Sequence, residues 1–304
     1  MNLKRKLLSA AFCLSALMAG ANVSLDTASA STSHPEYGHM YVSFQNNGNV
    51  GGVNYKDEDV VAYDITTQTW EMVFDGSSAG VTQEVNAFSF DDSGNLLMSF
   101  AKEVTLPGLG LVDDSDVVKF TPASLGANNT AGTWEMYVDG SDIGLDRNAE
   151  DIDALAYVDN AGGGQMGLII STAGRADVLD AQSNQIRPFD EDIIVFRPTS
   201  LGDTTAGSFQ TFIPGQDFGM DTKDEDLWAV SYNVSMIYLS TKGAFDIASP
   251  ATNGAATGTG SDLIGCTNVP TTSGPACHVT LEMEGYRINI PANATIDGLY
   301  LPSN

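Results

Sequence analysis

The sequence predicts an all-β fold: a four-bladed β-propeller whose ring is closed by a C-terminal strand that joins the N-terminal blade. Three observations predict it. A unit of four short strand-like segments occurs four times, at periods of about 56 to 76 residues. Helical periodicity is nearly absent, and the segments are bounded by Gly, Asp, Asn and Pro. The repeat is also split between the two ends of the chain. Four strands per repeat at such periods are typical of propeller blades.

The second copy of the repeat gives the order of the strands within a blade. Residues 84–90 lead through a tight Asp/Gly turn into residues 96–100, which is the strand–turn–strand pattern of an inner hairpin. The third strand follows the acidic run 113–116, and the outermost strand contains Trp134. Crowding near an axis requires small side chains on the inner strands. They occur at equivalent positions: Ala87, Ala154, Ala229 and Gly298.

The two ends of the chain divide one repeat between them. Residues 40–74 supply the second, third and fourth strands of the first copy, and residues 294–301 supply only an inner strand. Pairing of this last strand with the first blade would close the ring and remove free sheet edges. A two-sheet sandwich is the alternative architecture, but it would not explain why the repeat is split.

The first thirty residues have the pattern of a secretory signal peptide. Basic residues at 4–6 precede a short apolar stretch at 7–20, and Ala28-Ser29-Ala30 offers a cleavage site, with 19–21 as a second choice. The apolar stretch is too short for a membrane anchor, and no later segment is apolar enough to span a bilayer. We therefore expect a signal peptide over 1–30, a single propeller domain over 31–304, and an exported protein, periplasmic or extracellular.

The charge of the mature chain limits its partners. Removal of residues 1–30 leaves 10 basic and 38 acidic residues, a net charge of −28. Such a charge argues against nucleic acid and anionic membrane surfaces as partners. It favours cations, or a saline setting in which an acidic surface stays soluble.

Many of the acids fall at repeated positions that should share one face of the propeller. In an antiparallel blade, the link between the second and third strands and the link to the next blade emerge on the same side, and the acidic runs lie in these links. Oxygen-only ligand sets suit hard cations, above all Ca²⁺ outside the cell. The alternative is that the acids only cap turns and bind backbone N–H groups. The candidate ligands are Asp59, Asp116, Asp192 and Asp262 before the third strands, and Glu84, Asp151 and Asp226, with Asn86, Asp153 and Asp297, nearer the axis.

Three further features carry predictions. Trp228 replaces an acid on an axial strand, so it is the aromatic residue expected to contact a ligand. Cys266 and Cys277 are eleven residues apart in a chain expected to be exported, which favours a local disulfide. The glycine-containing run 254–260 is expected to be a flexible loop before that disulfide.

Part of the repeat resembles that of a largely uncharacterised group of exported acidic bacterial proteins. Residues 120–126, 130–134 and 139–145 carry the resemblance, and 196–202 with 205–207 repeat it. The Cys266 to Cys277 segment looks like the terminal variant of that group. The resemblance implies an exported repeat protein and no particular activity. The acidic channel mouth is also loosely similar to calcium-centred propeller lactonases, an analogy at the level of fold alone.

Two hypotheses of function follow. The first is a calcium-binding recognition module whose acidic face binds a glycan, a matrix polymer or a protein partner. The second is a cation-dependent hydrolase or lyase acting on a polysaccharide or an ester. A convergent cleft holding a carboxylate of strongly raised pKa would favour the enzyme, and a flat acidic rim would favour the binder. The candidate catalytic residues are Asp151, Asp153, Asp226 and Asp297.

Overall fold

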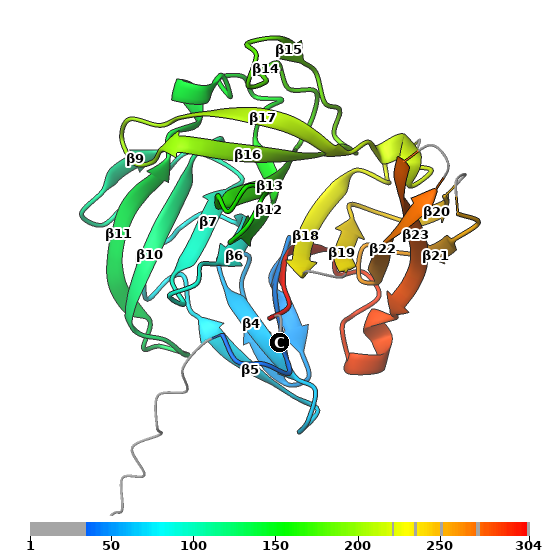
Figure 1. Cartoon of the computed structure of the whole chain (residues 1–304). Helices are drawn as coiled ribbons and strands as arrows, with labels where there is room; N and C mark the ends of the chain where they lie inside the picture. The colour runs from blue at the N-terminus through cyan, green and yellow to red at the C-terminus, as the bar shows by residue number, and fades with distance from the viewer. Residues whose placement is uncertain (1–34, 221, 234–235, 250–251, 272–273, 303–304) are drawn as a thin grey trace, which may run out of the picture. The chain divides into compact units, whose positions relative to one another are not determined.

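Four antiparallel sheets of four strands each form the framework of the computed structural model (Figure 1). The structure describes residues 35–302 except 221, 234–235, 250–251 and 272–273, all within the unit Ser33–Asn304. The predicted signal peptide lies outside the described residues. Within them, no helix is long and apolar enough to cross a membrane.

Each sheet has the strand order expected for a propeller blade, with the first strand of the repeat innermost. The blades, each given from the inner strand outward, are β24 (Ile296–Tyr300), β1 (His39–Phe44), β4 (Val60–Asp64) and β5 (Thr69–Phe74); β6 (Val85–Phe90), β7 (Leu96–Phe100), β10 (Val117–Ser124) and β11 (Ala131–Val138); β12 (Ile152–Val158), β13 (Gly167–Thr172), β16 (Ile193–Ser200) and β17 (Ala206–Ile213); and β18 (Leu227–Asn233), β19 (Met236–Thr241), β22 (Leu263–Thr271) and β23 (Gly274–Met283). We number them blades 1 to 4 in this order.

The inner strands form a closed ring. β6 packs against β12, β12 against β18, β18 against β24, and β24 against β6. The C-terminal strand β24 pairs with β1, with Tyr300 opposite Tyr41. The prediction of a four-bladed propeller closed by the last strand is therefore confirmed, and the closure leaves no inner edge open to other chains.

One backbone hydrogen bond recurs at every junction between blades. The amide of the first residue of each inner strand donates to a carbonyl in the turn that precedes the third strand of the blade before it. The junction between blade 4 and blade 1, where residues 284–295 lead from β23 into β24, uses the same bond as the others. The four bonds are Val85 N to Asp57 O (2.9 Å), Ile152 N to Asp114 O (3.3 Å), Leu227 N to Asp190 O (3.4 Å) and Ile296 N to Gly260 O (2.9 Å).

Large apolar side chains fill the spaces between and within the blades. All six residues of β6 are buried, as expected for a strand covered on both faces. Trp134 on the outer strand of blade 2 is 8% exposed and packs edge-on against Phe74 of blade 1. The matching tryptophan of blade 1, Trp70, is 7% exposed and donates its indole N–H to the carbonyl of Ile288. These tryptophans therefore serve packing between blades.

Each blade also contains a small two-stranded hairpin between its second and third large strands, which the sequence analysis did not predict. These hairpins have strands of only two to four residues, too short for a clear alternating pattern. The hairpins are β2 (Gly48–Val50) with β3 (Val53–Tyr55), β8 (Val104–Leu106) with β9 (Gly110–Val112), β14 (Val178–Leu179) with β15 (Gln185–Ile186), and β20 (Phe245–Ala248) with β21 (Ala255–Gly258).

The expectation of a flexible loop at 254–260 is therefore wrong. Residues 255–258 form strand β21, in which Gly258 pairs with Phe245. A Cβ atom on Gly258 would lie 2.5 Å from the Phe245 ring, so this glycine makes room for a buried aromatic side chain. The disulfide prediction is confirmed, because Cys266 and Cys277 are bonded across β22 and β23 with a Cα–Cα distance of 5.2 Å.

Candidate functional site

Four of the candidate acids occupy one repeated structural position, which we call the outer acid ring: Asp59, Asp116, Asp192 and Asp262. In blade 2, Oδ2 of Asp116 accepts from the amide of Asp113 and Oδ1 accepts from the amide of Gly140, both at 2.9 Å. The other three carboxylates accept the equivalent pair of bonds at 2.7 to 2.9 Å. Each carboxylate thus ties the turn before the third strand to the end of the fourth strand of its own blade.

A glycine at the end of each fourth strand makes these contacts possible. A Cβ atom on Gly140 would lie 2.3 Å from the carbonyl oxygen of Ser115, and one on Gly285 would lie 2.2 Å from that of Ser261. A side chain at either position would push the amide away from the carboxylate. The outer acid ring therefore has a complete structural role in which both oxygens of every carboxylate are occupied. Metal binding by these four acids stays a prediction.

A second repeated feature sits on the inner strands. In every blade the ladder between the first and second strands skips one residue, so that a β-bulge occurs at the same position of the repeat. A bulge leaves its extra residue unpaired and redirects its side chain. The four bulged residues are Asn86, Asp153, Trp228 and Asp297, which are the positions that the sequence analysis placed nearest the axis.

Three acids at or beside these bulges hold buried oxygens that find no hydrogen-bond partner among the described residues. They are both oxygens of Asp153, Oδ1 of Asp226 and Oδ2 of Asp297. The three side chains are 2%, 3% and 1% exposed. Burial of a polar group without a partner costs free energy, and burial of an unpaired charge costs far more. With Glu84 and Asp151 they form what we call the inner acid cluster.

The members of the inner acid cluster raise one another's pKa values. Burial raises the pKa of Asp153, and the charges of Asp226 and Asp151 raise it further. Burial likewise raises the pKa of Asp297, which hydrogen-bonds to Glu84 and feels the charge of Asp153. These mutual effects place the five acids near one another, although they come from four different blades.

Two members titrate near neutral pH. Burial, and then the charge of Asp114, raise the pKa of Asp151 to about 8, while a hydrogen bond from Asn86 opposes the shift. Burial and Asp190 raise the pKa of Asp226 to about 7, against the lowering effect of Lys242. The cluster therefore holds protons at pH values where ordinary carboxyl groups are fully ionised.

The polar neighbours of the cluster differ from blade to blade. Asn86 donates its amide to Oδ1 of Asp151 at 3.3 Å and to the carbonyl of Ile152 at 3.0 Å. Trp228 donates its indole N–H to Oδ2 of Asp226 at 3.2 Å, and its ring lies 5.0 Å from Nζ of Lys242. The structure thus brings Trp228 against the cluster, where it contacts a carboxylate and a lysine.

The carboxylates are gathered but are not arranged around a single point. Across the residues that the structure describes, no group of three or more histidine, cysteine, aspartate or glutamate side chains is positioned to hold a metal ion. A recess of about 270 Å³ on the acidic face is lined by Asp113, Asp114, Asp146 and Arg147 among others and by no member of the cluster. A cation at the cluster would require its carboxylates to rotate toward one another.

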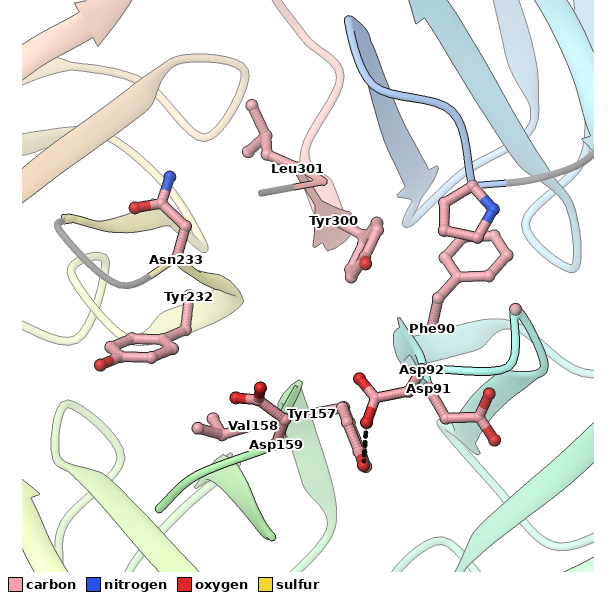
Figure 2. A pocket seen from close by; sticks show the side chains of 12 residues that line it. Phe90, Asp91, Asp92, Tyr157, Val158, Asp159, Tyr232, Asn233, Tyr300 and Leu301 are labelled. Atoms are coloured by element: carbon pink, nitrogen blue, oxygen red, sulfur yellow. Dashed lines mark hydrogen bonds between the residues drawn. The ribbon is translucent and has the colours of Figure 1, made fainter. Parts of the chain in front are cut away.

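A larger recess opens at the axis on the opposite face of the propeller, where the inner strands end (Figure 2). Its volume is about 300 Å³, and aromatic side chains and aspartates line it. The sequence analysis missed these residues. An available signal was the aromatic residue four positions after the bulge in three inner strands: Phe90, Tyr157 and Tyr232.

Two buried glutamates on the acidic face are structural. Glu150 is fully buried and accepts hydrogen bonds from the amides of Asp146, Arg147 and Asp177 at 2.9 to 3.0 Å. Glu225 accepts the equivalent bonds in blade 4, from residues 222 and 246. Each glutamate ties the link before an inner strand to the small hairpin of its blade.

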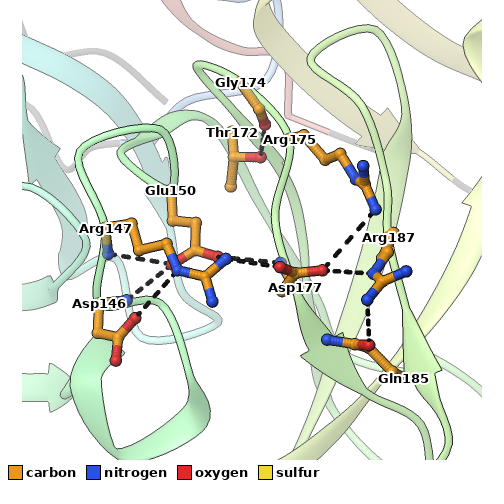
Figure 3. Close-up of polar contacts among 9 residues, drawn as sticks. All are labelled: Asp146, Arg147, Glu150, Thr172, Gly174, Arg175, Asp177, Gln185 and Arg187. Carbon is orange, nitrogen blue, oxygen red and sulfur yellow. Dashed lines mark hydrogen bonds and ion pairs between the residues drawn. The ribbon is translucent and has the colours of Figure 1, made fainter.

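Arginines neutralise the acid next to Glu150 (Figure 3). Oδ2 of Asp177 accepts from Arg147 at 2.6 Å, and Oδ1 accepts from Arg187 at 2.7 Å. The hydrogen bonds to these two arginines hold the pKa of Asp177 below its usual value. Asp177 is therefore a neutralised surface acid, unlike the inner acid cluster.

The comparisons with known proteins add no functional information. No protein-family model matches the chain, and no curated protein is detectably similar to it in sequence. Among solved structures it is similar to a protein of unknown function from Bacteroides caccae, at 6% identity over 86% of this chain and 97% of that one, with a TM-score of 0.32. It is also similar to the extracellular domain of a putative one-component system from B. thetaiotaomicron, at 11% identity over 85% of this chain and 35% of that one, with a TM-score of 0.30. At these TM-scores neither similarity supports an inference about this chain.

Proposed function

We propose that this chain is an exported propeller that binds Ca²⁺ at its inner acid cluster and uses its acidic face to recognise a glycan, a matrix polymer or a protein partner. The observation that carries the proposal is the set of buried oxygens on Asp153, Asp226 and Asp297 that have no hydrogen-bond partner within the described part of the chain. Carboxylates buried in this way are either protonated or neutralised by a cation. An all-oxygen set outside the cell favours Ca²⁺ over softer metals.

The acidic face also has the surface chemistry of a polar recognition site. The recess beside the cluster carries both signs of charge, from Lys102 and Arg147 on one hand and from Asp113, Asp114 and Asp146 on the other. Mixed charges suit hydroxyl-rich or protein surfaces, and the net charge of the chain disfavours polyanions. A cation bound at the axis would order the surrounding links and thereby the recess.

The first test is thermal unfolding of the mature protein in EDTA, in Ca²⁺ and in Mg²⁺ at fixed high ionic strength. A ligand that binds only the folded state raises the midpoint as its concentration grows. We expect a rise with Ca²⁺ of about 5 °C or more at saturation, a much smaller rise with Mg²⁺, and loss of the response in Asp153→Asn/Asp297→Asn. The matched control is Asp203→Asn, which removes one exposed charge far from the cluster. Equal midpoints in all three solutions would refute the metal site.

A second readout separates a specific site from general screening of an acidic surface. Asp151 and Asp226 have pKa values of about 8 and 7, so Ca²⁺ that binds the cluster at pH 7 must displace protons. Titration with Ca²⁺ in a weakly buffered solution should release on the order of one proton per protein. Screening of exposed carboxylates, which are already ionised, would release none.

The hydrolase or lyase alternative rests on Asp151. A carboxyl group with a pKa of about 8 beside ionised acids is suited to act as a general acid at neutral pH. It would be tested by incubating the calcium-loaded protein with neutral and acidic polysaccharides and with aryl esters, using Asp151→Asn as the inactive control. Turnover that this substitution abolishes would favour the enzyme, and binding without turnover would favour the recognition module.

A further inference from the structure

The axial recess on the face opposite the inner acid cluster is built from the ends of the inner strands of all four blades. Phe90 ends β6, Tyr157 and Tyr232 lie at the ends of β12 and β18, and Tyr300 ends β24. In Figure 2 the side chains of Phe90, Tyr157 and Tyr300 border the space between the strand ends, and the ring of Tyr232 points away from it. The volume of about 300 Å³ is at the small end of the range for ligand pockets, enough for a compact molecule.

Aromatic rings supply the walls and floor of this recess. Phe90 is buried and packs against Tyr300 with ring centroids 5.1 Å apart. Tyr157 and Tyr300 are partly exposed and can present ring surface to a ligand. The ring of Tyr232 instead packs against Phe212, with ring centroids 6.2 Å apart. Tyr157 donates its hydroxyl to Oδ2 of Asp92 at 3.0 Å, which fixes the orientation of its ring.

Aspartates supply the charge. Asp91, Asp92 and Asp159 line the recess, and no lysine or arginine is among its lining residues. Asp91 uses both oxygens within its own turn, where it accepts from residues 93 and 95. Asp92 and Asp159 are exposed and have oxygens to offer a ligand. Burial and the charges of Asp92 and Asp91 raise the pKa of Tyr300 to about 12, as expected where the local potential is negative.

We propose that this axial recess binds a small organic ammonium ion. Aromatic faces attract such a cation through their quadrupoles, and adjacent carboxylates add direct charge pairing. A bare metal ion would gain little from aromatic walls, because hard cations bind through oxygen ligands and water. Phosphate, sulfate and carboxylate ligands are disfavoured by the three aspartates. The proposal does not depend on calcium binding at the other face.

The probe is choline, compared with its uncharged isostere 3,3-dimethyl-1-butanol. Both are titrated by calorimetry into the mature protein at physiological ionic strength, where non-specific attraction to an acidic surface is screened. We expect choline to bind about tenfold or more tightly than the isostere. Equal affinity for the two compounds, or no choline binding, would overturn the proposal.

Variants assign the binding to this recess. Asp159→Asn and Tyr157→Ala should each weaken choline binding by about tenfold. Tyr157→Phe should leave it within about twofold, because the ring is kept. Asp203→Asn removes a similar exposed charge from a turn outside the recess and should change nothing. Equal weakening by Asp203→Asn and Asp159→Asn would show non-specific charge attraction and would refute the site. Preferential binding of an uncharged sugar such as glucose, lost in Tyr157→Ala, would replace the cation with a carbohydrate.

Discussion

The outer acid ring and the inner acid cluster lie on the same face, arise from the same repeat, and are opposite in chemistry. The outer acids are aspartate in all four blades, and each fills both of its oxygens with backbone amides. The bulge positions of the inner strands hold Asn86, Asp153, Trp228 and Asp297. The two aspartates among them keep buried oxygens for which the described residues supply no hydrogen-bond partner. The position that holds the same residue in all four blades is structural, and the position that differs between blades holds the unsatisfied polar groups.

The physical reason is that the two sets face different surroundings. An outer acid contacts only the backbone of its own blade, so the same contacts recur four times and the same residue serves in each. An inner acid faces the other three blades across the axis. Four identical acids there would repel one another in a space with little water, so the repeat must vary or a cation must bind. The inner acid cluster, whose residues differ from blade to blade, is therefore a better candidate for a binding site than the outer acid ring.

The largest expected effect concerns the outer acid ring. Asp116→Ala removes the carboxylate that accepts from the amides of Asp113 and Gly140. The hydrogen bond from Gly140 is buried, so its N–H group would lose its partner away from water. Hydrogen bonds to a charged group contribute about 1.5–3 kcal/mol each, so we expect a loss of about 3–5 kcal/mol in the free energy of unfolding. Urea denaturation measures it, with Asp203→Ala as the exposed control. A loss below about 1 kcal/mol would mean that the ring is not structural.

An intermediate effect is expected from pH. Asp151 and Asp226 have folded-state pKa values of about 8 and 7, above their ordinary value of 3.8. Groups raised in this way favour the folded state below pH 4, and that contribution is lost as the pH rises through 7 to 8. In EDTA, we expect the free energy of unfolding to fall by roughly 3–6 kcal/mol between pH 5 and pH 8.

The control for the pH effect is Asp151→Asn/Asp226→Asn, which should reduce the slope of the profile. Asp153, Asp297 and Glu191 also have raised pKa values, so they should keep the rest of the slope. Saturating Ca²⁺ should also flatten the profile, because it stabilises the ionised carboxylates. A stability that rises from pH 5 to pH 8 in EDTA would contradict the raised pKa values.

The smallest expected effect is the substitution Asp153→Asn in metal-free protein at pH 7. The asparagine side chain has nearly the same size as aspartate. Because burial raises the pKa of Asp153, the carboxyl group must take up a proton when the protein folds, and asparagine removes that requirement. We expect the free energy of unfolding to stay the same or rise by up to about 2 kcal/mol, the opposite sign to Asp116→Ala. Destabilisation by more than about 1 kcal/mol would show that Asp153 is structural, and the comparison between the two sets would fail.

The sequence was sufficient for the architecture. One of the four copies of the repeat is split between residues 40–74 and 294–301, which predicted a ring closed by the last strand, and β24 does pair with β1. Local spacing also placed the acids on one face, and a separation of eleven residues predicted the disulfide. These features follow from contacts that are local or repeated, which leave a pattern in the chain.

Only the tertiary structure decided which acids have partners. The second amide partner of Asp116, Gly140, is 24 residues away, and Asp226, which neighbours Asp153, comes from another blade, so neither contact appears in the spacing of residues. The small hairpins were hidden because their strands are too short to show a period. The aromatic recess was hidden because Phe90, Tyr157, Tyr232 and Tyr300 meet only when the ring closes. Whether a buried charge has a partner, and whether side chains line a pocket, depends on which residues are close in space, and the sequence does not record those distances.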